Sequence, residues 1–143
     1  MSVNKFNAEG YHDPTVYEAL TNIEKEIRRT ENAQIEWLHI DVMDGVFVDN
    51  ITYGNNVVAA MRKVSNIYFD THLMVTDPTF WVDQMIDIKC DYICMHEEVL
   101  NGLAFRLIDK IHDAGLKAGI VLNPETPVSA ILPYIDLLVS YTP

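Results

Sequence analysis

Residues 38–45 read Leu-His-Ile-Asp-Val-Met-Asp-Gly, and this stretch decides the fold. It predicts a strand, because apolar and polar side chains alternate along it and a strand has a side-chain period of two. His39, Asp41 and Met43 would then share one face. A parallel strand packed between helices normally carries apolar residues on both faces. An imidazole and a carboxylate on one face therefore indicate metal ligation or proton transfer.

Helical and strand patterns alternate along the chain on both sides of this strand. Strands separated by roughly 10–15 residues of helical pattern predict right-handed parallel crossover units. The five predicted strands span residues 36–41, 67–74, 92–96, 117–122 and 136–141, and residues 2–8 are a possible but polar sixth. The predicted helices span residues 13–29, 55–64, 77–88, 101–114 and 126–134.

The composition predicts one folded domain, residues 1–143, with a sizeable core. The formal net charge of -11 argues against nucleic acid as a partner, because its phosphates require a basic surface. The same charge argues against anionic membrane surfaces. No apolar run approaches the ~20 residues of a transmembrane helix, and residues 1–10 lack the basic and apolar regions of a signal peptide. The expected location is the cytoplasm.

The only two cysteines, Cys90 and Cys94, are weak evidence for a metal site. A structural zinc site usually takes four ligands from more closely spaced pairs. Cys94 also lies within an apolar strand pattern. We therefore expect two reduced thiols.

Residues of metal-ligand type gather where the predicted strands end, which is where parallel α/β folds place their functional groups. The strand ends carry His39, Asp41, Met43 and Asp44, then Asp70, His72 and Met74, then His96-Glu97-Glu98, and finally Asn123-Pro124. Two successive strands thus repeat a carboxylate and an imidazole at i, i+2 spacing. This repetition favours a functional site made of His39, Asp41 and His72.

Several of these residues also have a structural interpretation. Asp70 and His96 are as well suited to a supporting role as to a direct one. Met43 and Met74 are of a type that commonly fills gaps in packing. We expect four further residues to lie exposed at the surface: Glu97, Glu98, His12 and His112.

Two imidazoles and one carboxylate form a mixed nitrogen and oxygen donor set. This set suits zinc, iron, manganese or cobalt and does not choose among them. A divalent ion there would polarise a substrate carbonyl and stabilise the enediolate left when an adjacent C–H loses its proton. A carboxylate beside the ion could take that proton as a general base.

Three segments carry a recognisable pattern: His-Ile-Asp-Val-Met-Asp-Gly-Val-Phe-Val-Asp-Asn at 39–50, Asp-Thr-His-Leu-Met-Val at 70–75, and Leu-Asn-Pro-Glu-Thr-Pro at 122–127. Together they resemble the ribulose-phosphate 3-epimerase family, and the similarity runs from about residue 36 to residue 140. Residues 101–110 look closest to the allulose-6-phosphate 3-epimerase branch. The first segment is the most specific of the three.

The resemblance implies an α/β fold of the (β/α)8 TIM-barrel type, here truncated or incomplete, with about five to six parallel strands and intervening helices. It also implies a divalent metal ion held by His39, Asp41, His72 and a second aspartate from a later strand. In such a site Asp41 removes the C3 proton of a phosphorylated ketose, and the second aspartate returns a proton to the opposite face.

The resemblance further implies four substrate-binding residues. Met43 and Met74 match methionines that border the reacting centre. His96 and Asn123 match positions that line the mouth of the barrel.

Three features depart from the family pattern. Residues 1–12 show no Pro-Ser-Ile/Leu motif, and Tyr141 falls near the family's third methionine. The chain ends at Pro143, before the second aspartate, the glycine loops that hold phosphate and the last two strands. A closed barrel typically needs about 200 residues or more.

Two hypotheses follow. The first is a metal-dependent epimerase acting at C3 of ribulose 5-phosphate or allulose 6-phosphate, with little turnover expected from these 143 residues alone. The second is a catalytically incomplete paralogue that serves as a binding or assembly module. Either form is expected to be a homo-oligomer, because an open sheet leaves unpaired edges. A Schiff-base aldolase is disfavoured, because Lys117 begins its predicted strand rather than ending it.

Overall fold

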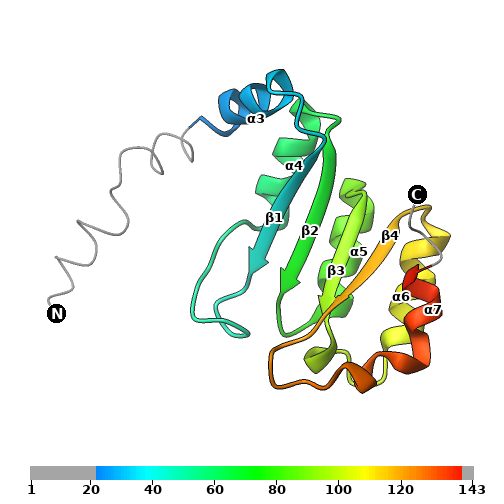
Figure 1. Cartoon of the computed structure of the whole chain (residues 1–143). Helices are drawn as coiled ribbons and strands as arrows, with labels where there is room; N and C mark the ends of the chain where they lie inside the picture. Colours follow the sequence, from blue (N-terminus) through cyan, green and yellow to red (C-terminus); the bar gives the residue numbers. More distant parts are fainter. Residues whose placement is uncertain (1–21, 140–143) are drawn as a thin grey trace, which may run out of the picture.

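A computed structural model describes residues 22–139 as a parallel sheet with helices packed behind it (Figure 1). The strands, in spatial order, are β1 (Trp37–Met43), β2 (Tyr68–Met74), β3 (Tyr92–His96) and β4 (Lys117–Val121). The helices are α3 (Ile23–Asn32), α4 (Asn55–Val64), α5 (Pro78–Ile88), α6 (Ala104–Asp113) and α7 (Ile135–Val139). The predicted α/β class is confirmed. Sequential parallel strands with intervening helices are consistent with an incomplete TIM barrel.

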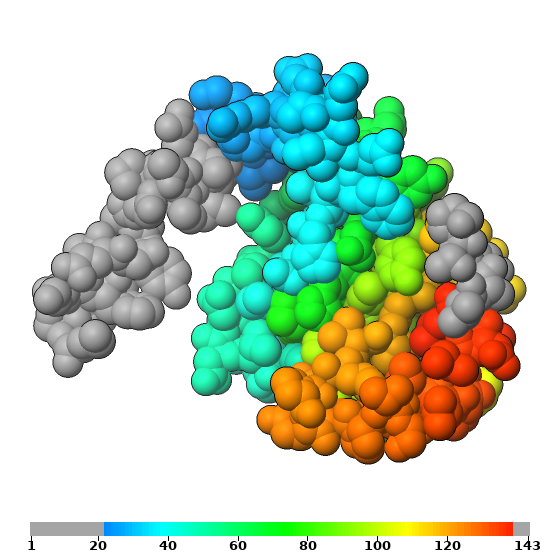
Figure 2. Space-filling view, viewed as in Figure 1, coloured from blue at the N-terminus to red at the C-terminus, as the bar shows by residue number. Residues whose placement is uncertain are grey.

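The two faces of the sheet differ in what covers them. Ile40 and Val42 of β1 and Leu73 of β2 are buried against the layer of α4, α5 and α6. The residues that alternate with them point to the opposite face and are half-buried or exposed. In the space-filling view, atoms of all four strands reach the surface on that face (Figure 2). The polar side chains of β1 and β2 therefore lie where a substrate could reach them.

Local sequence signals account for the helix boundaries. At the start of α5, the Asp77 carboxylate accepts a hydrogen bond from the Phe80 amide at 3.2 Å, and Pro78 occupies the first turn. Lys89 ends α5 in the left-handed conformation with φ of 63°. Gly115 follows α6 with φ of +77°, a conformation that glycine adopts without steric cost.

The C-terminal region differs from the prediction. Residues 135–139 form α7, so the strand predicted at 136–141 is wrong for the described part of the chain. A short apolar run has no clear period, and here Leu137 and Leu138 pack on the core from a helical turn. The helix predicted at 126–134 is instead two 3-10 turns, η2 (Val128–Ala130) and η3 (Leu132–Tyr134), because Pro133 has no amide hydrogen to continue a helix.

The strand count changes accordingly. Residues 22–139 contain four strands rather than five or six. The possible strand at 2–8, the beginning of the helix predicted at 13–29, and His12 lie outside the described residues. The remaining part of that helix is α3, which extends to Asn32. The assignment of a single domain stays a prediction.

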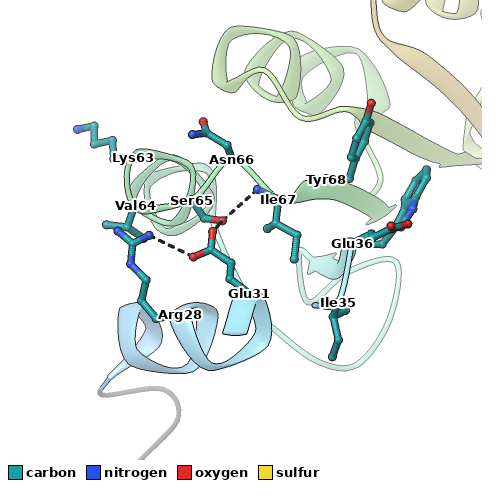
Figure 3. Close-up of a pocket in the computed structure, with 11 residues that line it drawn as sticks. Arg28, Glu31, Ile35, Glu36, Lys63, Val64, Ser65, Asn66, Ile67 and Tyr68 are labelled. Carbon is teal, nitrogen blue, oxygen red and sulfur yellow. Dashed lines mark hydrogen bonds and ion pairs between the residues drawn. The ribbon is translucent and has the colours of Figure 1, made fainter. Parts of the chain in front are cut away.

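A surface hollow of about 750 Å³ lies at the amino-terminal ends of β1 and β2 (Figure 3). Within it, the Glu31 carboxylate accepts hydrogen bonds from the Ser65 hydroxyl and from Arg28 at 3.1 Å. The Ser65 hydrogen bond is the main reason that the pKa of Glu31 is lowered. The contact between Glu31 and Ser65 connects α3 to the turn that follows α4. The hollow is therefore a structural junction, at the opposite end of the strands from the predicted site.

Candidate metal centre and active site

The register of the sheet brings the three predicted ligands together. β1 and β2 are parallel, and Asp41 pairs with His72. Residues paired in this way point to the same face of a sheet. One ligand-type atom from each of His39, Asp41 and His72 lies within 4.8 Å of the others. The trio that the sequence singled out is thus one cluster at the carboxyl ends of neighbouring strands.

His39 is held by a carboxylate from the neighbouring strand. Its Nδ1 lies 2.7 Å from Asp70 Oδ2, and its Nε2 lies 3.2 Å from Asp41 Oδ1. The hydrogen bond to Asp70 raises the pKa of His39, against the opposing effect of burial. The His39 side chain is 54% exposed. We refer to His39 and Asp70 as the exposed arm of the site.

His72 is held through a second imidazole. Its Nδ1 lies 3.1 Å from the same Asp41 Oδ1, and its Nε2 lies 2.8 Å from His96 Nε2. The other nitrogen of His96, Nδ1, lies 3.1 Å from Glu98 Oε2. The side chains of His72 and His96 are only 18% and 6% exposed, and burial lowers the pKa of His96. We refer to His72, His96 and Glu98 as the buried arm.

Glu98 is a fixed acceptor, and the prediction that it is a solvated loop charge is wrong. Its Oε1 accepts hydrogen bonds from the Asn123 amide at 2.8 Å and from the Thr126 hydroxyl. Burial alone would raise the pKa of Glu98, but these hydrogen bonds outweigh it and bring the pKa to about 2. Glu98 was missed although it follows His96 at the same i, i+2 spacing that marks the first two strands.

Glu97 also departs from the prediction of an exposed charge. Its carboxylate accepts a hydrogen bond from the Tyr134 hydroxyl. Burial raises the pKa of Glu97. His112 is half-buried rather than exposed. Glu97, Glu98 and His112, the three residues predicted to be exposed that the structure describes, are therefore all half-buried.

The loop after β1 closes over the buried arm. Asp44 accepts hydrogen bonds from the amides of Val46 and Phe47, each at 2.8 Å, and from the Thr76 amide at 2.8 Å. These bonds outweigh burial and lower the pKa of Asp44 to about 2. The Phe47 ring consequently lies 4.6 Å, centroid to centroid, from the ring of His96. Asp44 thus anchors a loop that shields His96.

The predicted substrate-binding residues fall in three environments. Met43 and Met74 pair with each other at the ends of β1 and β2 and are half-buried. His96 is buried beneath Phe47. Asn123 contributes its backbone amide to Glu98. Contact of these side chains with substrate stays a prediction.

The cysteines behave as free thiols, as expected. Cys94 lies on the face of the site, with its Sγ 3.6 Å from Asp70 Oδ1. Burial, together with the nearby Asp70, raises the pKa of Cys94. A thiol held neutral in this way is a poor metal ligand, so the imidazole and carboxylate groups form the candidate donor set.

The donor set fits a divalent transition-metal ion. Imidazole nitrogen and carboxylate oxygen are the usual ligands of zinc, iron, manganese and cobalt. Each of His39 and His72 also has a hydrogen-bond partner on the ring nitrogen that faces away from Asp41. Such outer partners orient metal-binding histidines in proteins.

Comparison with known proteins identifies the family of the chain. The model of the ribulose-phosphate 3 epimerase family matches residues 16–140. The ribulose-phosphate 3-epimerase of Schizosaccharomyces pombe is 40% identical over 120 residues, which are 82% of this chain and 52% of that protein. The enzyme of Bacillus subtilis is 42% identical over 106 residues, 74% of this chain and 48% of that protein. The chain spans about half the length of these relatives. It belongs to the ribulose-phosphate 3-epimerase family.

Proposed function

We propose that this chain carries one half of the active site of a divalent-metal-dependent sugar-phosphate 3-epimerase. The observation that supports this is the position of one oxygen. Asp41 Oδ1 lies 3.2 Å from a nitrogen of His39 and 3.1 Å from a nitrogen of His72. This position supports a role for one carboxylate as both a ligand and a base.

Each residue of the cluster has a distinct role in the proposed reaction. His39, Asp41 and His72 hold a divalent ion, which when bound polarises the ketose carbonyl and stabilises the enediolate. Asp41 takes the proton from C3 as general base. Met43 and Met74, paired at the strand ends, border the reacting carbon and limit its contact with water.

Inversion at C3 needs a second acid on the opposite side of the sugar. In residues 22–139 the carboxylates in hydrogen-bond contact with the site, Asp70 and Glu98, come from the same sheet as Asp41 or from the segment after it. Among these described residues, Asp41 is thus also the group that can return the proton, to the face that it left. We propose that this chain exchanges the C3 proton faster than it inverts the carbon.

The test is deuterium exchange in heavy water with ribulose 5-phosphate and, separately, allulose 6-phosphate, with zinc or manganese added. We expect deuterium at C3 in at least one sugar, with little epimer formed. The preferred sugar tests the branch prediction, which favours allulose 6-phosphate. An Asp41→Asn variant is the matched control and should exchange the proton about 10³-fold more slowly. Exchange equal to that of this control in the unmodified chain would contradict the proposed function.

A role as an assembly module is supported by a different observation. Trp37 and Tyr68 are 44% and 47% exposed and stack at 5.1 Å between ring centroids at the other end of the strands. Exposed aromatic side chains of this kind are typical of surfaces that associate. Light scattering at micromolar concentration tests this function and the predicted homo-oligomer, and a monomer would contradict both.

A Schiff-base aldolase remains disfavoured because of the position of Lys117. Lys117 is the first residue of β4, and its amide donates to the carbonyl of Asp91. It therefore lies at the opposite end of the strand from Asp41 and His72. Borohydride trapping with a phosphorylated ketose is expected to leave the chain unmodified.

A cytoplasmic location also stays a prediction. In residues 22–139, no helix combines the length and the apolar character required to cross a membrane. Microscopy of the chain fused to a fluorescent protein tests the location directly.

A further inference from the structure

We propose that Thr52 is a positioning residue for Asp41. Its side chain bonds the outer edge of β1, the edge that faces away from β2, and so holds the main chain that carries the Asp41 carboxylate. The effect on a bound cation rests on the proposed function. The contacts of Thr52 with β1 do not, because they join groups within the chain.

The first step concerns the direction of the main-chain groups along β1. In a parallel pair, alternate residues direct both their N–H and their C=O groups to the same neighbouring strand. The Asp44 amide donates to the last residue of β2 at 3.4 Å, and the Glu36 carbonyl accepts from the first residue of β2 at 3.1 Å. The even-numbered residues between them therefore face β2. Asp41 and Met43 direct their main-chain groups to the outer edge.

Thr52 occupies this outer edge. Its hydroxyl donates to the Asp41 carbonyl and accepts from the Met43 amide at 3.1 Å, and its own amide donates to the Met43 carbonyl at 3.4 Å. A hydroxyl has one hydrogen to donate and two lone pairs that accept, so both of its contacts can be made together. Main-chain groups at the edge of a sheet otherwise lack a partner strand. Thr52 thus supplies, from a loop, bonds of the kind that a further strand would supply.

The loop after β1 is shaped to bring Thr52 back to the strand. Gly45 turns the chain with φ of +76°, a conformation that glycine adopts without steric cost. A Cβ atom at this position would lie 2.7 Å from the Ile51 side chain, so glycine also permits the close return of the chain. Ile51 forms an antiparallel bridge with Asp44. The next residue is Thr52, and its approach to β1 follows from this turn.

The contact with Asp41 matters because its carboxylate has two partners at once. Asp41 Oδ1 lies 3.2 Å from His39 Nε2 and 3.1 Å from His72 Nδ1. A shift of the main chain by about 1 Å can lengthen either contact beyond hydrogen-bond range. Misplacement by about 1 Å can lower the rate at a catalytic site by about 10²-fold. Thr52 therefore acts on the carboxylate through the main chain of β1.

Thr52→Val is the substitution that tests this role. Valine neither donates nor accepts from its side chain, so the Asp41 carbonyl and the Met43 amide lose their hydroxyl partner. Thr52→Ser keeps the hydroxyl and should restore both contacts. Thr30→Val is the matched control, because Thr30 is also half-buried and its hydroxyl donates to a main-chain carbonyl, within α3, at 2.9 Å. A general loss of stability would affect the two valine variants alike.

The direct measurement is hydrogen exchange of the Met43 amide in the metal-free chain, followed by nuclear magnetic resonance. We expect this amide to exchange about tenfold faster in Thr52→Val, which corresponds to the loss of one hydrogen bond. Thr52→Ser and Thr30→Val should exchange it at nearly the rate of the unmodified chain. An unchanged rate in Thr52→Val would overturn the inference. Exchange in the unmodified chain as fast as in an unfolded peptide would overturn it without any variant.

Zinc affinity, measured by titration calorimetry, tests whether the contact reaches the carboxylate. Loss of an outer partner typically weakens metal binding by about 10–100-fold, and we expect Thr52→Val to lie near the lower end of this range. Thr52→Ser should restore the affinity, and Thr30→Val should bind zinc as the unmodified chain does. Circular dichroism confirms that each variant is folded. Equal zinc affinity of Thr52→Val and Thr30→Val would also overturn the inference.

The outcomes separate the role of Thr52 from the proposed function. If the unmodified chain binds no zinc, the proposed function fails, and exchange of the Met43 amide alone decides whether Thr52 holds the edge of β1. If the unmodified chain and Thr52→Val bind zinc equally well, the proposed function stands and the positioning role fails.

Discussion

The two arms of the site reach the same oxygen of Asp41 in different ways. The exposed arm is one contact long, since His39 is held directly by Asp70 on the adjacent strand. The buried arm consists of two successive contacts, from His72 to His96 and from His96 to Glu98. Glu98 also accepts a hydrogen bond from the Asn123 amide in the segment after β4. Their candidate ligands come from β1 and β2. Within residues 22–139, the side chains of the exposed arm meet β3 only at Cys94, whose Sγ contacts Asp70, whereas the buried arm continues into residues that follow β3 and β4. The later strands therefore set the orientation of a ligand that an earlier strand supplies.

The largest effect is expected on the C3 exchange rate when Asp41, which contacts both arms, is replaced. Asp41→Asn keeps the size of the side chain but removes its ability to take a proton. A positioned general base typically contributes 10²–10⁴-fold, so the C3 exchange rate should fall by about 10³-fold. Exchange measured by nuclear magnetic resonance with saturating zinc checks this. A fall of less than about tenfold would show that another group acts as the base.

The second-largest effect is expected on the free energy of unfolding when the central residue of the buried arm, His96, is replaced. His96→Leu leaves Glu98 and His72 without their shared partner in a region that excludes water. We expect the free energy of unfolding to fall by about 2–3 kcal/mol, measured by urea denaturation of the metal-free chain. The exposed-arm variant Asp70→Asn is the comparison and should lose less than about 1 kcal/mol. If His96→Leu and Asp70→Asn lower the free energy of unfolding equally, the two arms do not differ in their contribution to stability.

The exposed arm should matter more for metal than for stability. Asp70→Asn weakens the group that orients His39, and zinc affinity should fall by about tenfold. Calorimetric titration with zinc chloride measures the change. The surface substitution Asp109→Asn serves as the charge-matched control, since Asp109 lies exposed on α6. If both variants bind zinc equally, Asp70 has no orienting role.

A smaller effect concerns acid stability. The pKa of Asp44 is lowered to about 2 by the amides it holds. A lowered pKa contributes stability that is present above the unfolded-state value, about 3.8, and is lost as pH falls towards 2. Asp44→Asn removes this contribution, so its urea midpoint should fall less steeply between about pH 4 and about pH 2. Some acid dependence should remain in Asp44→Asn, because the pKa of Glu98 is also lowered. If the urea midpoints of the unmodified chain and of Asp44→Asn fall in parallel with pH, the role of Asp44 is contradicted.

The smallest effect is expected from the ring that covers His96. Phe47→Leu keeps an apolar side chain and removes the aromatic contact at 4.6 Å. Contacts between rings contribute about 0.5–1.5 kcal/mol, so the loss of stability should lie at the lower end of this range. Urea denaturation measures it. A gain in stability would indicate that the loop, rather than the ring, shields the buried arm.

The exposed arm and the clustering of His39, Asp41 and His72 could be predicted from the sequence, because alternation along a strand is a local signal. His39, Asp41 and His72 stand out against apolar neighbours and lie at the ends of strands that pair in sequence order. The buried arm could not be predicted in the same way. Glu98 owes its role to Asn123 and Thr126, which reach it only through the path of the chain after β4.

The C-terminal strand was mispredicted for a related reason. Residues 135–139 are almost entirely apolar, so helix and strand both match the pattern. Packing of Leu137 and Leu138 on the core decides between them. Predictions based on periodicity therefore succeed where one face is polar and fail where the segment is uniformly apolar.

The pairing of β1 with β2 has a consequence for how the protein forms. All three candidate ligands belong to one β-α-β unit, β1, α4 and β2, so their cluster can assemble from contacts close in sequence. Local contacts form early in folding, and any species that binds a folded unit preferentially stabilises it by mass action. Under the proposed function, metal availability would then influence the yield of folded chain during synthesis, before β3 and β4 have emerged from the ribosome.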